Sequence, residues 1–328
     1  MSGIILNKST LAEPLVQVTE ALRGYEIKNV RFAADGILPL ANSDVKSGVL
    51  PTFRAGETLM IPSVERSPGD PYPRSAFNVD GKTFICHEYG HEVPVPEETE
   101  KELRLNLAVS IAAKAAFQLK LKREQRVANA LFNTSLFTGA ALYTDVSTAW
   151  SAANAATMTP VADIEAAKEL VLSATGAVAN TVLLNHVNLR YLKGCEDLVT
   201  QELIQVNPAA GKPADSPEFL AYLAEKFGVK QVIVPTCVYN STNNSATPTL
   251  LPIWSSSYCL VAYVPEAMGA DDLAAEGLGR TVAWTQDGGV EVVESYYDES
   301  RRSNIIRVRQ SIAEFLNSEK YAHLLKVD

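Results

Sequence analysis

Cysteine, histidine and long apolar runs are scarce in this sequence. The chain has four histidines and four cysteines in 328 residues, and the cysteines are far apart with no Cys-x-x-Cys pair: Cys86, Cys195, Cys237 and Cys259. Four cysteines are too few for a disulfide scaffold at this length, so we expect reduced thiols and synthesis in a cytoplasm. The first residues lack the basic flank and apolar stretch of a signal peptide, and no run is apolar enough to predict a membrane span.

Positive charge is also in short supply. Lys and Arg together number 29 against 38 Asp and Glu, which gives a formal net charge of -9. This balance argues against tight or sequence-specific binding of nucleic acid by the whole surface, although a container whose inner wall faces packed DNA remains compatible with it. The hydrophobic share of 47% and charged share of 20% are those of a globular protein. A chain of this length predicts two compact lobes.

One catalytic signature occurs, in a context that does not suit it. Residues 87–91 (His-Glu-Tyr-Gly-His) match the HExxH signature of zinc peptidases, which needs both histidines one helical turn apart. The motif follows a β-patterned run, contains Gly90, and precedes two prolines, Pro94 and Pro96, that exclude helix. No nucleophile elbow, Walker loop or dinucleotide fingerprint is found. We therefore expect neither catalysis nor a cofactor or metal, and we keep a zinc-dependent peptidase as a less favoured alternative.

The first part of the chain predicts two extended segments. A capping box of Thr10 and Glu13 precedes apolar residues at helical spacing (Leu11, Leu15, Val18 and Leu22), so a short helix could dock on its own core or lie on a neighbour. Further on, β-patterned residues 57–61 and 82–86 flank a polar, proline-rich middle. This pattern predicts a long antiparallel hairpin that stands away from the body. An isolated hairpin is marginally stable, so we expect another chain to stabilise it.

A long helix is predicted from Pro96 to about Phe132. Proline suits the first helical turn, where its missing N–H costs little. Acidic residues crowd the start and basic residues the end (Lys120, Lys122, Arg123 and Arg126), as the helix dipole favours. The basic cluster could contact DNA, but a solvated face is the favoured interpretation.

Helix and strand patterns alternate after residue 156. Residues 163–175 and 216–227 predict helices, and residues 181–184, 231–234 and 258–263 predict strands, which together indicate a second lobe built on a small sheet. Strand patterns return at 281–284, 290–297 and 304–309, and a short helix around Ile312, Phe315 and Leu316 is expected to end the chain. In the last strand Arg307 and Arg309 share a face, which could touch DNA, touch a neighbour's carboxylates or be solvated.

This order of elements resembles the tailed-bacteriophage major capsid proteins, which share the Hong Kong 97-type coat fold. Local stretches are similar too, at residues 36–40, 124–132, 160–164, 176–185, 220–229 and 252–254. The resemblance implies an α+β fold with five parts. These are an N-terminal arm (1–45), an extended β-hairpin loop (46–93), a peripheral domain with a spine helix (94–155), an axial α/β domain (156–272), and completion of the peripheral domain with a C-terminal helix (273–328).

The same resemblance implies a major coat protein that self-assembles as hexamers and pentamers into an icosahedral head around double-stranded DNA. Assembly in the host cytoplasm would give a virion component. The implied partners are further copies of the chain, portal, scaffold and decoration proteins, and packaged DNA through non-specific contact. No charged helical region precedes the arm, so a separate scaffold is expected. An encapsulin-type shell protein is the nearest alternative, and a monomeric α/β binding protein is another.

Nine residues are candidate intersubunit contacts because they lie on the predicted hairpin or the last strands. They are Arg66, Asp70, Arg74, Lys82, Arg301, Arg302, Asn304, Arg307 and Arg309. Some members of the resembled family crosslink a hairpin lysine to an asparagine of another subunit. Lys82 and Asn304 have the matching residue types in the matching regions.

Overall fold

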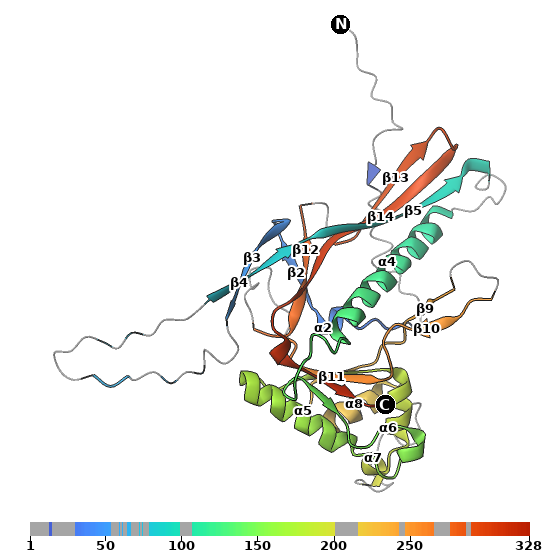
Figure 1. Ribbon diagram of the computed structural model, residues 1–328. Helices are drawn as coiled ribbons and strands as arrows, with labels where there is room; N and C mark the ends of the chain where they lie inside the picture. The colour runs from blue at the N-terminus through green and yellow to red at the C-terminus, as the bar shows by residue number, and fades with distance from the viewer. Residues whose placement is uncertain are drawn as a thin grey trace.

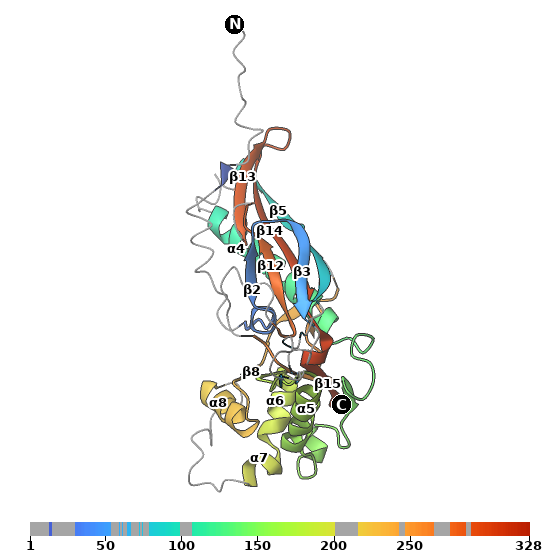
Figure 2. The same cartoon turned by 90° about the vertical axis from the view of Figure 1, so that its left-hand side faces the viewer.

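Two β-sheets, each packed against helices, form two lobes that meet at a shared hydrophobic cluster (Figures 1 and 2). The computed structural model describes residues 13–14, 30–53, 59, 61, 64–66, 72, 74, 79–98, 107–200, 216–242, 247–265, 276–286 and 290–328. No helix among these residues is both long and apolar enough to span a bilayer.

The sheet of the first lobe is built around one long strand, β14 (Ser303–Leu316). On one side, β14 pairs with β13 (Val292–Asp298) and then with β12 (Gly279–Trp284); on the other side it pairs with β5 (His87–Pro96). Short strands extend the sheet, β1 (Glu13–Pro14) beside β13 and β2 (Leu40–Ser43) beside β12. Every pairing is antiparallel except that of β2 with β12.

Helix α4 (Leu107–Leu131) covers one face of this sheet. Its small side chains, among them Ala112 and Ala116, pack on Ile306 and Val308 of β14, and alanine lets the helix approach the sheet closely. Because successive strand residues point to opposite faces, Arg307 and Arg309 lie on the face away from α4. The period of two along β14 therefore decides which side chains join the core of the first lobe.

The second lobe has a five-stranded sheet in the order β6 (Tyr143–Asp145), β15 (Ala322–Lys326), β11 (Tyr258–Ala262), β7 (Thr181–Leu184) and β8 (Gln231–Ile233). Its helices gather at one end of the molecule (Figure 2): α5 (Pro160–Thr175), α6 (His186–Lys193), α7 (Glu196–Thr200) and α8 (Pro217–Lys226). Short 3-10 turns lie at Ala152–Asn154 and Glu319–Tyr321. Strand β7 is buried on both faces, which explains its unbroken apolar pattern.

The two lobes meet at a shared core on one face of this second sheet. Val182 and Leu184 face the helices of the second lobe, whereas Leu183 faces the end of α4 and the short helix α2 (Ala34–Ile37). Val127 and Leu131 of α4 belong to that same cluster. The arrangement of the lobes is therefore fixed by apolar packing as well as by chain connections.

Two ribbons stand out on opposite sides of the molecule in Figure 1. One is the hairpin of β3 (Ser47–Phe53) and β4 (Val79–Ile85), on the left. The other, on the right, pairs β9 (Val238–Asn240) with β10 (Leu250–Pro252).

The hairpin confirms one predicted strand and corrects the other. Strand β4 overlaps predicted residues 82–86, but its partner is β3, ten residues before the predicted 57–61. Of that predicted strand only Leu59 and Ile61 are described, and neither is in a strand. The sequence did not predict β3 because it contains Gly48 and Pro51, and both residue types are rare in strands.

The end of the chain also departs from expectation. Ile312, Phe315 and Leu316 belong to strand β14 and not to a helix. Their spacing imitates a helix because Ile312 and Phe315 are buried on opposite faces of a strand that is covered on both sides. The last strand, β15, lies in the second sheet although residues 273–328 were expected to complete the first lobe, and β6 joins it there from the predicted range 94–155.

Pro96 does not begin the long helix as predicted, but Glu97 and Glu98 are helical and α4 is described from Leu107 to Leu131. Pro96 is the last residue of β5, where it pairs with Ser303, and residues 99–106 lie outside the described part of the chain. Strand β5 also moves the boundary of the hairpin, because residues 87–93 belong to the sheet of the first lobe.

Candidate assembly surfaces

The hairpin has one face on its own chain and one face open. Leu50 and Phe84 point inward and pack with Val282 and Phe315 of the first sheet. The register places Val49 and Ile85 on the opposite face, where they are 61% and 56% exposed. We call the exposed apolar residues Val49, Pro51 and Ile85 the hairpin strip. Large apolar side chains left open on one face of a ribbon are typical of a surface that another chain covers.

The predicted contact residues of the hairpin lie in different settings. Arg66 and Arg74 are exposed, and the Arg66 guanidinium lies 4.5 Å from the ring centre of Tyr72. Asp70 lies outside the described residues. The Lys82 ammonium donates a 2.5 Å hydrogen bond to the backbone oxygen of Asn317, so Lys82 ties the hairpin to its own body.

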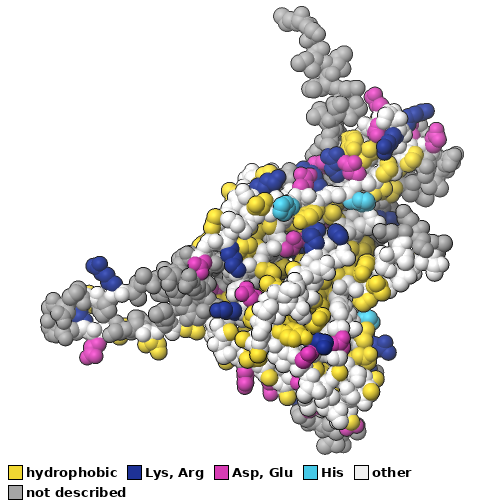
Figure 3. Space-filling view, in the orientation of Figure 1, with side chains coloured by type: hydrophobic (Ala, Val, Ile, Leu, Met, Phe, Trp, Pro, Cys, Tyr) yellow, Lys and Arg dark blue, Asp and Glu magenta, His cyan; other side chains and the backbone are white. Residues whose placement is uncertain are grey.

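The predicted basic row on β14 is paired with carboxylates of the same chain. Arg307 lies 2.6 Å from Glu92 of β5 and 3.5 Å from Glu294 of β13. Arg309 lies 2.8 Å from the same Glu294. The guanidinium carbon of Arg307 lies 5.1 Å from the centre of the Tyr296 ring. The hydrogen bond to Glu92 raises the pKa of Arg307 further above its usual value. Basic and acidic side chains are interspersed over this lobe in Figure 3.

The remaining candidates cluster at the turn between β13 and β14. Arg301 is exposed and 3.9 Å from Asp298, and Arg302 has a positive φ of 44°. Hydrogen bonds from Ser300 to the Asp298 carboxylate lower its pKa and hold the turn together. Asn304 lies between Val95 of β5 and Tyr297 of β13. The structure therefore brings the five predicted residues of the last strands together around one ladder and keeps them apart from those of the hairpin.

We predicted that the basic cluster of α4 is a solvated face, but two of its arginines contact the rest of the chain. Arg123 is buried, 2.7 Å from Asp35 and 3.1 Å from the Thr281 hydroxyl. Arg126 pairs with Glu314 at 2.6 Å, and its guanidinium lies 3.7 Å from the Tyr89 ring centre. These two arginines fasten α4 to the sheet. Of the other two members, Lys122 is exposed and Lys120 is half-buried.

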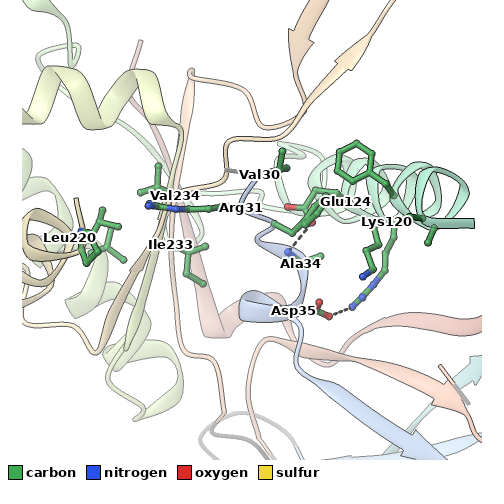
Figure 4. A pocket seen from close by; sticks show the side chains of 16 residues that line it. Val30, Arg31, Ala34, Asp35, Lys120, Glu124, Leu220, Ile233 and Val234 are labelled. Carbon is green, nitrogen blue, oxygen red and sulfur yellow. Dashed lines mark hydrogen bonds and ion pairs between the residues drawn. The ribbon is translucent and has the colours of Figure 1, made fainter. Parts of the chain in front are cut away.

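A cavity of about 600 Å³ lies between the lobes, against the buried carboxylate of Glu124 (Figure 4). Its walls come from the leading segment (Val30, Arg31, Phe32, Ala34 and Asp35), from α4 (Ala113, Ala116, Phe117, Lys120, Arg123 and Glu124) and from the second lobe (Pro217, Leu220, Val232, Ile233 and Val234). The cavity thus marks the joint where three segments that are distant in sequence come together.

Glu124 accepts hydrogen bonds from two of those segments. The backbone N–H groups of Ala33 and Ala34 donate to it at 2.6 and 3.0 Å, and the Trp254 indole donates at 2.7 Å. Burial raises the pKa of Glu124 more than these hydrogen bonds lower it. Sequence reasoning missed this residue, although its position one turn before Val127 and Ala128 and two turns before Leu131 placed it on the buried face of the helix.

The histidine motif does not form a metal centre of the peptidase kind. Residues 87–91 lie in strand β5, which places the Cα atoms of His87 and His91 roughly 13 Å apart, where a helix would place them about 6 Å apart along its axis. Within the described residues no group of three or more His, Cys, Asp or Glu side chains could hold a metal ion.

Comparisons with solved structures identify the fold. A phage-related protein from Bordetella bronchiseptica RB50 has 17% identity and a TM-score of 0.67, with 96% of this chain and 97% of that chain covered. The capsid structure of the cyanophage P-SCSP1u gives 12% identity, a TM-score of 0.54 and coverage of 92% and 90%. The chain has the phage capsid fold. This confirms the α+β, Hong Kong 97-type fold that the sequence resemblance implied.

The capsid fold is shared beyond phages. A virus-like particle from Pyrococcus furiosus matches with 12% identity, a TM-score of 0.54 and coverage of 95% and 96%. No protein-family model matches the sequence, and no curated protein matches it either. At these identities the capsid fold is carried by the arrangement of elements and not by shared residues.

Proposed function

We propose that this protein is the major coat protein of a phage head, and that many copies assemble into a closed shell. The observation that carries the proposal is a correspondence of fold over nearly the whole chain, 92% of it matching 90% of a cyanophage capsid chain. The capsid fold here comes with no additional catalytic lobe among the described residues. Shell building, with no chemical step, is the function that suits it.

The exposed hairpin strip supports self-association. Val49 and Ile85 lie open to solvent on a ribbon whose other face is anchored to the first sheet. A second copy of the chain that covers this strip would remove apolar surface from water, worth roughly 25 cal/mol per Å². Each contact can be weak, because the closure of a shell multiplies the contacts of every copy.

In this proposal hexamers and pentamers of one chain form an icosahedral head around double-stranded DNA. The first lobe would be the peripheral domain, with α4 as its spine, and the second lobe the axial domain. Portal, scaffold and decoration proteins would complete the head. Contact with DNA would be non-specific, in keeping with the net charge of -9 and with the internal pairing of Arg307 and Arg309.

The test is electron microscopy and analytical ultracentrifugation of the purified chain, alone and co-expressed with candidate scaffold proteins. We expect rings or closed particles of uniform size. A protein that stays monomeric at high concentration under all these conditions would contradict the proposal and favour a monomeric binding protein. Stoichiometric zinc together with casein cleavage would favour the peptidase alternative.

The same particles separate a phage head from an encapsulin-type shell. The Pyrococcus furiosus particle shows that this fold also occurs in a virus-like particle, so fold alone does not decide between the two. Particles from the native host that contain DNA support a phage head, whereas DNA-free particles that enclose an enzyme support the alternative. On a denaturing gel, species larger than one chain would support the proposed Lys82–Asn304 crosslink, and monomers alone would dismiss it.

A further inference from the structure

The cavity between the lobes has a mostly apolar wall and the size of a small-molecule site. Eleven of its 16 lining residues are apolar, and the other five are charged. The rings of Phe32 and Phe117 meet edge to face on this wall, with their centres 5.8 Å apart. Its volume of about 600 Å³ lies within the range of roughly 300–1,000 Å³ that is typical of ligand pockets. A small molecule with an apolar body would therefore fit.

The charged lining residues favour a ligand with a single negative charge. Three of them are cationic (Arg31, Lys120 and Arg123) and two are acidic (Asp35 and Glu124), which leaves one positive charge in excess. The whole chain, in contrast, has a formal net charge of -9. Binding sites and their ligands carry complementary charge, so this local excess suits a monoanion better than a cation.

The hydrogen-bonding groups of the cavity point to the same kind of ligand. Both acidic groups are engaged: Glu124 accepts three hydrogen bonds, and Asp35 lies 2.7 Å from Arg123. Arg123 is 8% exposed, and its buried Nε–H has no hydrogen-bond partner among the described residues. A buried donor without a partner is costly and uncommon. The cavity wall therefore offers a donor that a ligand oxygen can satisfy.

Lys120 supplies a second donor, on the same helix one turn before Glu124. Its ammonium lies 3.8 Å from the Glu291 carboxylate, which is too long for a hydrogen bond, and its side chain is 43% exposed. In Figure 4 Leu220 of α8 lies at the far side of the cavity from Lys120. A ligand whose charged group lies at Lys120 would thus extend its apolar part toward Leu220.

We propose that the cavity between the lobes binds an amphipathic carboxylate, a molecule with one carboxylate group and an apolar chain. The carboxylate accepts hydrogen bonds from Lys120 and from the Nε–H of Arg123, and the chain lies against the apolar wall. This inference goes beyond the proposed shell function and does not depend on it. Because the leading segment, α4 and the second lobe all line the cavity, the ligand would stabilise the joint between the lobes.

Titration of the purified full-length chain with octanoate tests the proposal. Isothermal titration calorimetry and native mass spectrometry should show one saturable site per chain. Octanoate should also raise the melting temperature, because it binds the folded state only. The neutral alcohol 1-octanol has the same chain length and no charge, so we expect it to bind at least about fivefold more weakly, the loss that one partly solvated ion pair would give.

Two lysines of α4 give a matched pair of variants for the carboxylate end. Lys120→Ala removes the proposed partner and should weaken octanoate binding about fivefold, since an ion pair at a half-exposed lysine is partly screened by solvent. Affinity for 1-octanol should not change. Lys122 is exposed, lies outside the cavity and donates to Gln125, so Lys122→Ala should bind octanoate as the wild type does.

The apolar end is tested by filling the cavity. Leu220→Trp should abolish octanoate binding, because the larger ring occupies the space of the chain. Leu172→Trp on α5 places the same ring at a leucine that is 44% exposed and outside the cavity, and it should bind octanoate normally. Far-UV circular dichroism checks that each variant folds. If Leu220→Trp does not fold, the comparison of Lys120→Ala with Lys122→Ala decides.

Several results would overturn the proposal. These are the absence of saturable octanoate binding at millimolar concentrations, equal affinities for octanoate and 1-octanol, equal effects of Lys120→Ala and Lys122→Ala, and unchanged binding in a folded Leu220→Trp variant. None of them bears on the shell function, which is judged by whether the wild-type chain forms particles.

Discussion

Replacement of Glu124 by alanine tests whether one buried carboxylate holds the joint between the lobes. The substitution removes the acceptor for three donors: the N–H groups of Ala33 and Ala34, and the indole N–H of Trp254. All three residues are buried, so their donors cannot turn to bulk water. Loss of the carboxylate should therefore loosen the leading segment and the second lobe from α4 at the same time.

The magnitude follows from the count of orphaned donors. A buried donor without a partner costs about 1–3 kcal/mol. Removal of a desolvated carboxylate offsets part of that cost, so the low end applies to each donor. We expect Glu124→Ala to lower the free energy of unfolding by roughly 3 kcal/mol.

The assay is urea unfolding of the unassembled chain, followed by far-UV circular dichroism. A double-mutant cycle with Trp254→Phe isolates one of the three hydrogen bonds, because phenylalanine keeps a ring and lacks the donor. In the Glu124→Ala background Trp254→Phe should cost less than in wild type, with a coupling of about 1–2 kcal/mol. Additivity within about 0.5 kcal/mol would refute the role given to this bond.

The pH dependence of stability tests the direction of the Glu124 pKa shift independently. Because burial raises the folded-state pKa of Glu124 above its unfolded value, its contribution to stability is complete below the unfolded pKa and is lost as pH rises through the folded one. The stability gap between wild type and Glu124→Ala should therefore widen as pH falls from 7 toward 5. A gap that narrows would mean that the hydrogen bonds outweigh desolvation.

Three further predictions use other buried groups. Burial raises the pKa of the Cys237 thiol to about 12, and it also raises the pKa of the Cys259 thiol. Neither thiol should react with a thiol reagent at pH 8 until the chain is unfolded, and fast labelling of either in the native protein would contradict their buried placement. Burial lowers the pKa of His323, so its contribution to stability is present above the unfolded pKa of about 6.5 and is lost as pH falls through the folded pKa. His323→Gln should therefore reduce the fall of the urea midpoint over this acidic range. An unchanged dependence of the urea midpoint on pH would contradict this role of His323. Gly279→Ala would drive a Cβ into the backbone oxygen of Phe315 and should cost about 1–3 kcal/mol, whereas Gly90→Ala, with its nearest contact at 3.5 Å, should leave the melting temperature unchanged.

Elements with a single clear period were predicted well. Predicted residues 181–184 coincide with β7, and predicted 216–227 matches α8, where the Ser216 hydroxyl caps the first turn by accepting a hydrogen bond from Phe219. Burial on one or two faces requires a simple, regular spacing of apolar residues in such segments. Local capping chemistry then fixes their ends.

Segments shaped by distant contacts were not predictable from one sequence. Glu314 meets Arg126 across 188 positions, and Glu92 meets Arg307 across 215, so no local pattern links the partners. Strand β3 contains Gly48 and Pro51, so its local sequence does not predict a strand. It is stabilised by pairing with β4 and by packing of its inner face on the first sheet. The resemblance to coat proteins supplied the order of elements, but not these pairings.

The hairpin separates folding from assembly by the alternation of its side chains. Leu50 and Phe84 cannot leave the first sheet without exposing Phe315, which ties the inner face to the stability of the chain itself. Val49 and Ile85, one position before and one after these residues, contribute almost nothing to that core, because they face solvent. Selection on the outer face can therefore tune the contact between copies without weakening the fold. A strand register shifted by one residue would lose both properties at once, so the Leu50–Lys82 and Val49–Thr83 pairing is the feature on which both depend.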